Sequence, residues 1–316
     1  MMARQAEMKK EVGPGRIRLG LCCIFKREPI RFRATTAKYL LQFSRREQLS
    51  KLSGLCLQNS ESLLAALRFL LKNGIGAFRI LSPFFPRYTH PDVGYSLEDL
   101  PDAEAIFYNL RQAKEFRDRH GIRLSFHPDQ FIVLSSPQKK VVESARKELE
   151  YQAMLAEHVG ADVINIHGGG AYSDKRTTLQ RFKQNFQFLS STVQQRLSLE
   201  NDDRTYTVAD LAPICEELRI PLVYDVHHHR CKPDGLTVEE ATALSRRTWD
   251  KVGREPYFHV SSPANGWQGP DARPHADFID PGDFPQCWKG FNVTVDVEAK
   301  AKELAVLELK KALGIC

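Results

Sequence analysis

The sequence predicts an α/β fold of the TIM (β/α)8 barrel type, and three observations support this prediction. Short runs rich in Val, Ile and Leu alternate with helix-like segments eight times along the chain, as expected for parallel strands joined by covering helices. The length of 316 residues accommodates a barrel of about 250 residues with extensions. A doubly wound open sheet is the alternative, but no GxGxxG sequence follows the first predicted strand.

The eight predicted strands are short, and several consist almost entirely of apolar residues. Such continuous runs indicate strands that are covered on both faces, as in a barrel surrounded by helices. In chain order, the predicted strands span residues 16–22, 77–82, 123–127, 162–167, 197–201, 222–227, 257–261 and 292–297.

Two connecting segments carry signals for both ends of a helix. Ser60 is the predicted N-cap of a helix that stops at Asn73 and Gly74. A second helix is predicted to begin at Pro137 and to end at Gly160, with apolar residues spaced to cover one face. Both segments lie between predicted strands, as the barrel requires.

Two further helices begin at threonines. Thr207 is the predicted start of a helix in which Pro213 would have to sit in an irregular first turn. Thr237 begins another helix, and Glu240, three residues later, completes a capping-box pattern. These two helices follow the fifth and sixth predicted strands.

The composition is that of a globular protein. Apolar residues make up 42% and charged residues 27% of the chain, which excludes a disordered chain, a coiled coil and a collagen-like rod. We expect no transmembrane helix and no secretory signal, because no long apolar run occurs. Seven scattered cysteines fit a reduced intracellular chain. The predicted organisation is a disordered tail over residues 1–15 and a single domain over residues 16–316, in a cytoplasmic protein.

Positive charge is concentrated near the N-terminus. The chain has a formal charge of +6, yet residues 1–50 alone hold 12 basic and 4 acidic residues. This distribution indicates a polyanionic partner, or alternatively an ordinary solvated surface.

Histidines and carboxylates stand at or near the carboxyl ends of six consecutive predicted strands. In a TIM barrel these ends meet at one rim, where the active site lies. So many ionisable groups in a barrel mouth are costly unless they are paired or bind metal. Imidazole and carboxylate suit Zn²⁺, Mn²⁺ or Fe²⁺, so we predict a polynuclear metal site. The residues are His127, His167, Glu200, Asp225, the run 227–229, His259 and Glu298.

Within this series, Glu200 is central and is a candidate bridge between two ions. Neighbours in the 227–229 run point to different sides, so one or two ligands are expected there. His90, in the loop after the second strand, is a candidate metal ligand or phosphate contact. His275, beside Asp277, is a candidate ligand of a third ion.

Two loops after these strands have further possible roles. Gln130 and Phe131 follow His127 closely and could wedge into a nucleic-acid duplex, or Phe131 could anchor the loop by packing inward. Three glycines at 168–170 let the backbone approach a ligand closely, or form a simple turn.

The ordered motifs of the chain resemble those of the UV damage endonucleases, over roughly residues 16–300. This family is similar in fold to the barrel-type apurinic endonucleases and the xylose isomerases. The motifs are GLCCIF, FRATT, FHPDQF, NIHGGG, LEND, DVHHH, FHVSS, HADFI and DVEAK.

The resemblance implies a TIM barrel with two or three divalent ions, commonly Mn²⁺, with Zn²⁺, Co²⁺ or Mg²⁺ as alternatives. It implies an enzyme that nicks double-stranded DNA directly 5′ to cyclobutane dimers and 6-4 products. The nick would leave a 3′-hydroxyl and a 5′-phosphate and would start an alternative excision repair.

The resemblance also implies a role for individual residues. Gln130 and Phe131 would probe the lesion, and catalysis would involve His127, Glu200 and His259. By analogy, one ion would be held by His127, His167 and Glu200, a second by Glu200, Asp225, His259 and Glu298, and a third by His228 and His275, with His90 as a further ligand.

The chain departs from the family pattern at two positions. Tyr257 stands where some members have a Lys, and Leu21 follows Gly20 where some have an aromatic residue. We expect a monomer that acts inside the cell, associated with the nucleoid if the source is bacterial. An apurinic-site endonuclease, a metal-dependent sugar isomerase or epimerase, and a DNA-binding protein that has lost catalysis are the alternatives.

Overall fold

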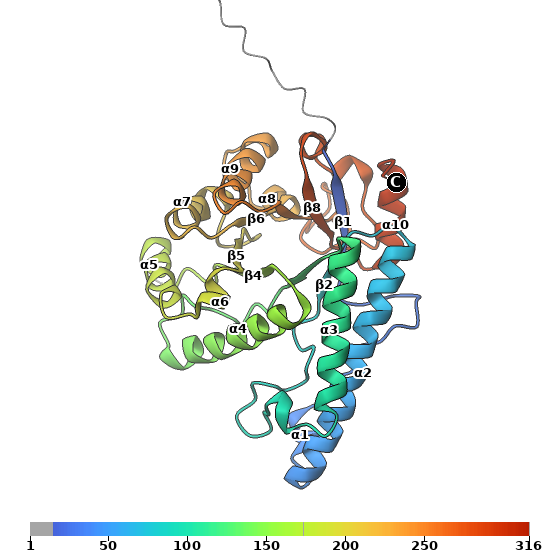
Figure 1. The fold of residues 1–316 in the computed structure, drawn as a ribbon. Coiled ribbons are helices and arrows are strands. Elements are labelled where there is room, and N and C mark those ends of the chain that lie inside the picture. Colours follow the sequence, from blue (N-terminus) through green and yellow to red (C-terminus); the bar gives the residue numbers. More distant parts are fainter. Residues whose placement is uncertain (1–14, 173, 316) are drawn as a thin grey trace, which may run out of the picture.

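Eight parallel strands close into one barrel, which confirms the predicted fold (Figure 1). The structure is a computed structural model that describes residues 15–172 and 174–315, so the predicted N-terminal tail, Gly15 excepted, lies outside the described residues. The strands pair in chain order, and β8 returns to pair with β1. They are β1 (Ile17–Cys22), β2 (Ala77–Ile80), β3 (Arg123–Phe126), β4 (Val163–His167), β5 (Leu197–Glu200), β6 (Leu222–Asp225), β7 (Tyr257–Val260) and β8 (Val293–Val297).

Helices surround the barrel, and α2 and α3 lie side by side and reach past its strands (Figure 1). Among the described residues, none of the helices combines the length and the apolar character that crossing a membrane requires. The helices are α1 (Ala37–Leu40), α2 (Arg45–Lys72), α3 (Ala103–His120), α4 (Lys139–Val159), α5 (Lys175–Phe186), α6 (Ser191–Gln194), α7 (Val208–Leu218), α8 (Val226–Cys231), α9 (Val238–Asp250) and α10 (Glu303–Ala312). Three short 3₁₀ turns complete the elements, at Leu97–Asp99, Pro281–Asp283 and Gln286–Gly290.

Helix α2 begins sixteen residues before the position predicted from the sequence. Ser44 is its N-cap, and a capping box joins Ser44 to Glu47. Ser60 lies buried inside the helix, where its hydroxyl donates to the carbonyl of Leu57 at 2.7 Å. The prediction was wrong because the buried stripe of α2 contains small and polar residues, including Ser53 and Asn59, which hide the apolar period.

Helix α7 begins after its cap Thr207, as predicted, but Pro213 lies in its interior rather than in an irregular first turn. The helix loses one backbone hydrogen bond there, since proline has no N–H. Its apolar face, which includes Leu211 and Cys215, is buried and holds the helix in place.

The other predicted helix ends agree with the structure within two residues. Helix α4 begins at Lys139 and ends at Gly160 in the left-handed conformation. The capping box of α9 joins Thr237 and Glu240.

The register of the strands places pairs of ionisable residues side by side. His167 on β4 is the partner of Glu200 on β5, and Asp225 on β6 is the partner of His259 on β7. Glu298 follows β8 directly, and its backbone N–H donates to Val260 on β7 at 2.9 Å. Because all strands run the same way, these side chains meet at the carboxyl end of the barrel.

Candidate metal centre

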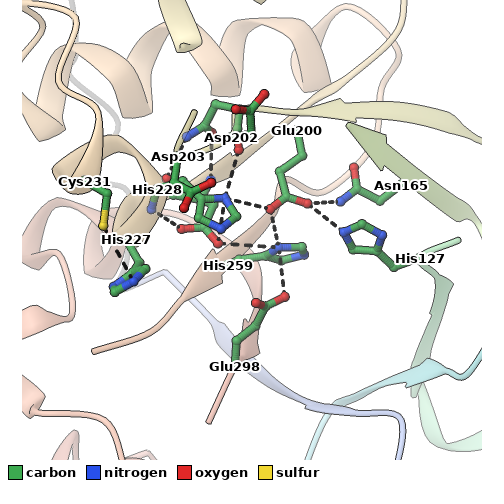
Figure 2. A network of polar contacts seen from close by, with 12 residues as sticks. His127, Asn165, Glu200, Asp202, Asp203, His227, His228, Cys231, His259 and Glu298 are labelled. Atoms are coloured by element: carbon green, nitrogen blue, oxygen red, sulfur yellow. Dashed lines mark hydrogen bonds and ion pairs between the residues drawn. The ribbon is translucent and has the colours of Figure 1, made fainter. Parts of the chain in front are cut away.

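Three groups of side chains at the barrel mouth could each hold a metal ion. Within each group, one ligand atom per residue lies within 4.8 Å of the others. The first group is His127, His167 and Glu200; the second is Glu200, Asp225 and His228; the third is Asp225, His259 and Glu298. Glu200 and Asp225 each belong to two groups, so the three groups form one continuous cluster. Figure 2 labels members of each group, among them His127, His228 and Glu298.

Glu200 lies at the centre of this cluster, with 1% of its surface exposed. Its Oε2 accepts from His127 Nε2 at 3.0 Å and from the amide of Asn165. Its Oε1 lies 3.2 Å from His259 Nδ1 and 3.3 Å from His228 Nδ1. The two carboxylate oxygens therefore face different groups, an arrangement suited to bridging two ions.

Asp225 ends β6 and caps the short helix α8 that follows at once. Its Oδ1 accepts from the backbone N–H of His228 at 2.8 Å, which starts the helix directly after the strand. Its Oδ2 lies 3.5 Å from His228 Nδ1 and 3.9 Å from His259 Nδ1. The prediction of a strand through 227 was therefore wrong, because the cap converts residues 226–231 into a helix.

Helical geometry separates the three consecutive histidines, and only His228 joins a ligand group. His229 is tied down by Tyr224 Oη at 2.6 Å and by Asp234 Oδ1 at 3.1 Å. His227 is buried with its Nε2 3.1 Å from the carbonyl oxygen of Arg273. The expectation of one or two ligands in this run stays a prediction, with His228 as the candidate.

A buried arginine supports the third group from beneath. Arg79 Nη2 donates to Glu298 Oε1 at 2.5 Å, and Arg79 Nε lies 3.1 Å from Asp296 Oδ2. Tyr257 donates to Asp296 Oδ1 at 2.7 Å. The Arg79 guanidinium thereby fixes Oε1 of Glu298, while Oε2 lies 3.6 Å from His275 Nδ1.

Sequence reasoning missed Arg79, Asn165 and Asp296, all of which point into the barrel. Each is a polar residue in a buried strand made mostly of apolar residues, in AFRI, VINIH and VTVDV respectively. A buried polar residue needs a partner, so these interruptions were the signal that could have found them.

The charges of the cluster shift its pKa values in opposite directions. Burial alone would lower the pKa of His259, but the adjacent carboxylate of Glu200 raises it to about 9. Burial would raise the pKa of Glu200, but His259 and its neighbouring histidines hold it well below its usual range.

Several buried atoms in the cluster have no hydrogen-bond partner, and this fits metal ions. They are His167 Nδ1, Asp225 Oδ2 and His259 Nδ1. Buried polar atoms without partners are costly and rare, and His259 Nδ1 lies only 3.9 Å from Asp225 Oδ2. The donor set of imidazole nitrogens and carboxylate oxygens suits Zn²⁺, Mn²⁺ or Fe²⁺.

Phe131 projects from the loop between β3 and α4, with 73% of its surface exposed. Gln130 beside it is also exposed. Inward packing of Phe131, the structural alternative considered from the sequence, is therefore excluded. The loop is held instead by Leu134, which is buried and whose carbonyl accepts from Asn185 Nδ2 at 2.8 Å.

Comparison with known proteins identifies the family. The model of the UV-endonuclease UvdE family matches residues 17–315. The chain belongs to the UV-endonuclease UvdE family. A UV DNA damage endonuclease of Bacillus velezensis is 32% identical over 92% of this chain and 91% of its own length. A UV-damage endonuclease of Neurospora crassa is 39% identical over 82% of this chain, which spans 41% of that longer protein.

Solved structures agree with this assignment to the UvdE family. The crystal structure of SacUVDE has 29% sequence identity and a TM-score of 0.83, covering 95% of this chain and 98% of that one. Endonuclease IV from Thermus thermophilus shares the barrel fold, with a TM-score of 0.58 and 13% identity over 95% of this chain and all of that one.

Two histidines implied by the UvdE resemblance stand outside the three groups formed by the described residues. His275 lies at the edge of the cluster, with Nδ1 3.6 Å from Glu298 Oε2 and its ring 5.1 Å from that of His227. His90 lines a separate hollow of about 680 Å³, together with Arg87 and Lys140. Its Nδ1 accepts from the backbone N–H of Asp92 at 3.2 Å.

The two departures from the UvdE pattern lie beneath the cluster. Tyr257 is buried, and besides Asp296 its hydroxyl meets Ser125 Oγ at 2.8 Å. Gly20 lies against Asp296, because a Cβ there would be 2.2 Å from Asp296 Oδ1. Leu21 is buried in the apolar core. Tyr257 is therefore packed inside the barrel, whereas Leu21, which follows the inward-facing Gly20 on β1, packs on the outer face of the strand.

Proposed function

We propose that this protein is a metal-dependent DNA repair endonuclease that nicks the damaged strand immediately 5′ to UV photoproducts. The substrates would be double-stranded DNA with cyclobutane dimers or 6-4 products, and the nick would leave a 3′-hydroxyl and a 5′-phosphate. The observation that carries the proposal is the continuous cluster of ligand groups at the barrel mouth, with Gln130 and Phe131 exposed beside it. Membership of the UvdE family supports the same reading.

The chain's own residues account for the binding of the ions. His127, His167 and Glu200 would hold one ion, with Asn165 and the carbonyl of Pro128 orienting Glu200 and His127. Such ions activate water and neutralise the charge that develops on the phosphodiester.

The remaining ligands would hold the second ion and a third. Asp225, His259 and Glu298 would hold the second, with Glu200 as a further ligand, since its Oε1 lies 3.2 Å from His259 Nδ1. His228 and His275 would hold a third, and Glu200 and Asp225 form a ligand group with His228. His90 stands outside the three groups formed by the described residues and lines a hollow with Arg87 and Lys140, so it would contact the DNA backbone instead.

The exposed loop that carries Gln130 and Phe131 would determine which DNA substrate is cut. Gln130 and Phe131 would enter the duplex at the lesion, where stacking is already weakened and a base is easier to displace. The solvent-exposed arginines and lysines of residues 26–46 would hold backbone phosphates. We further propose that the protein acts as a single-domain monomer inside the cell, with Mn²⁺ as its metal.

The test is nicking of three matched duplexes by the Mn²⁺-loaded protein: undamaged, UV-irradiated and abasic. The proposal predicts a nick immediately 5′ to the photoproduct that EDTA abolishes. Strong cleavage of the abasic duplex with little cleavage of the irradiated one would indicate an apurinic-site endonuclease. No cleavage of any duplex, despite bound metal, would contradict a nuclease function and favour a sugar substrate.

A further inference from the structure

A second exposed aromatic ring stands on the loop beside that of Phe131. Tyr172 is 50% exposed and lies between β4 and α5. It follows the metal-ligand candidate His167 by five residues, just as Phe131 follows His127 by four. Because β3 and β4 are neighbours in the barrel, the two rings rise from adjacent loops at the mouth.

The loops that carry these two rings are packed against each other. Gly169 adopts a left-handed φ of +82°, and a Cβ there would lie 2.7 Å from Val133 Cγ1 and 2.8 Å from Ser135 Oγ. Ser135 Oγ also donates to the carbonyl of Gly168 at 2.8 Å. The glycine run thus permits close contact between the loops and couples the placement of Tyr172 to that of Phe131.

The half-exposed ring of Tyr172 makes a cation–π contact. The guanidinium of Arg181 lies over it, 5.7 Å from the ring centroid. Arg181 is itself fixed, since Nε donates to the carbonyl of Ser135 at 3.1 Å and Nη2 to Thr178 Oγ1 at 3.0 Å. Tyr172 has a left-handed backbone with φ 50°, which is uncommon for a bulky residue and typical of functional sites.

We propose that Tyr172 and Phe131 form a two-ring stacking platform for DNA bases, and that Tyr172 helps to select the damaged duplex. The inference rests on the proposed function. Aromatic rings stack on bases of any sequence, and an arginine against the ring suits a polyanionic ligand. Bases at a lesion are displaced more easily than bases in an intact duplex. A platform that accepts displaced bases therefore favours damaged DNA.

The experiment compares the wild-type protein with Tyr172→Ala and Tyr172→Phe, all loaded with Mn²⁺. Single-turnover nicking of a duplex with one cyclobutane dimer, measured against protein concentration, separates half-saturation from the maximal rate. An undamaged duplex added as competitor reports the affinity for intact DNA. Phe188→Ala is the matched control, because Phe188 is 65% exposed but lies between α5 and α6, at the opposite end of the barrel.

We expect Tyr172→Ala to raise the half-saturating concentration for the dimer duplex by about 5- to 150-fold, the range for one lost base-stacking contact. Affinity for the undamaged competitor should stay within about twofold of the wild type, since non-specific binding is carried by the phosphates. Tyr172→Phe, which keeps the ring, and Phe188→Ala should both behave like the wild type.

Three results would overturn the platform. Tyr172→Ala could have the same half-saturating concentration for the dimer duplex as the wild type. Alternatively, it could lose affinity for the dimer duplex and for the undamaged duplex to the same extent. Tyr172→Phe could lose as much affinity for the dimer duplex as Tyr172→Ala, which would indicate a contact through the hydroxyl. Bound metal and the melting temperature are measured for each variant, and a loss of metal in Tyr172→Ala would also count against the proposal.

Failure of this proposal is distinguishable from failure of the proposed function. If the wild-type protein nicks the dimer duplex and Tyr172→Ala does so equally well, only the platform is wrong. If the wild-type protein fails to nick the dimer duplex at all, the endonuclease function is wrong, and the platform with it.

Discussion

Both ends of the barrel contain buried charged side chains, but the hydrogen bonding of these side chains differs between the ends. At the amino end, every nitrogen of the Arg123 guanidinium has a partner, including Asp162 Oδ2 at 2.8 Å and the carbonyl of Glu255 at 2.8 Å. At the carboxyl end, His167, Asp225 and His259 each have a buried ligand atom without a hydrogen bond. Two nitrogens of Arg254, beside Asp162 at the amino end, also lack a hydrogen bond, but a guanidinium has no acceptor and cannot bind a cation. The unsatisfied histidine and carboxylate atoms at the carboxyl end therefore indicate a site for a metal ion.

The pKa shifts follow the same division. At the amino end, Arg123 and Asp162 shift each other in the directions expected of a closed ion pair, despite their burial. At the carboxyl end, His259 and His228 have raised pKa values, because carboxylates crowd around them. Protons and metal ions therefore compete for the same atoms only at the carboxyl end.

The largest effect is expected from Glu200→Gln, which removes the charge shared by two groups. Loss of an outer hydrogen-bond partner of a metal ligand typically costs about 10- to 100-fold, so loss of a bridging ligand should reduce nicking by more than about 100-fold. Metal content should fall in parallel, as measured by elemental analysis of the dialysed protein. Undiminished nicking by a folded Glu200→Gln protein would remove Glu200 from the mechanism.

Metal affinity should depend strongly on pH at the carboxyl end. Below its pKa of about 9, His259 carries a proton that a metal ion must displace, so affinity should rise by up to about tenfold per pH unit. The rise should level off above pH 9. Titration calorimetry with Mn²⁺ between pH 6 and 8 measures this dependence, and a flat profile would contradict the role of His259.

The stability of the metal-free protein should show the opposite trend. The folded-state pKa of His259 exceeds its ordinary value of about 6.5, so its stabilising effect is complete below pH 6.5. That effect is lost as the pH rises through 9. The melting temperatures of the EDTA-treated and Mn²⁺-loaded proteins should therefore differ more and more as the pH increases.

At the amino end, Arg123→Met should destabilise the fold without changing metal binding. Breaking a fully buried pair costs about 3–5 kcal/mol. Because the Asp162 side chain is 39% exposed, we expect a smaller loss of unfolding free energy, about 2–3 kcal/mol. Urea unfolding and metal analysis test this together. A fall in the number of bound ions would show that the two ends are coupled.

The smallest effect is expected between the two ends, from Tyr257→Phe. The variant leaves Asp296 Oδ1 without the hydroxyl that donates to it at 2.7 Å. The expected cost is about 1–3 kcal/mol of unfolding free energy, with metal content unchanged. If Tyr257→Phe loses an ion, then this position acts on the metals and is more than a buried support.

Most of the barrel could be predicted from the sequence, because each strand is a short apolar run followed by a helix. The start of α2 could not, since polar residues such as Ser53 and Asn59 interrupt its buried face. The ligand candidates could be predicted because they lie at strand ends, where topology alone brings them together.

Long-range pairing was the part that the sequence did not reveal. Arg79 and Glu298 are 219 residues apart, yet Arg79 fixes the oxygen of Glu298. The separation of His228 from His227 and His229 depends on the cap at Asp225, which turns a predicted strand end into a helix. The contact of Gly169 with Val133 depends on how two loops fold over the rim.

The most direct test of the difference between the two ends is anomalous diffraction at the manganese edge from crystals grown with Mn²⁺. The account predicts peaks between His127, His167 and Glu200 and between Asp225, His259 and Glu298, and none near Arg123. Crystals that hold manganese only at the protein surface, or none at the barrel mouth, would contradict it.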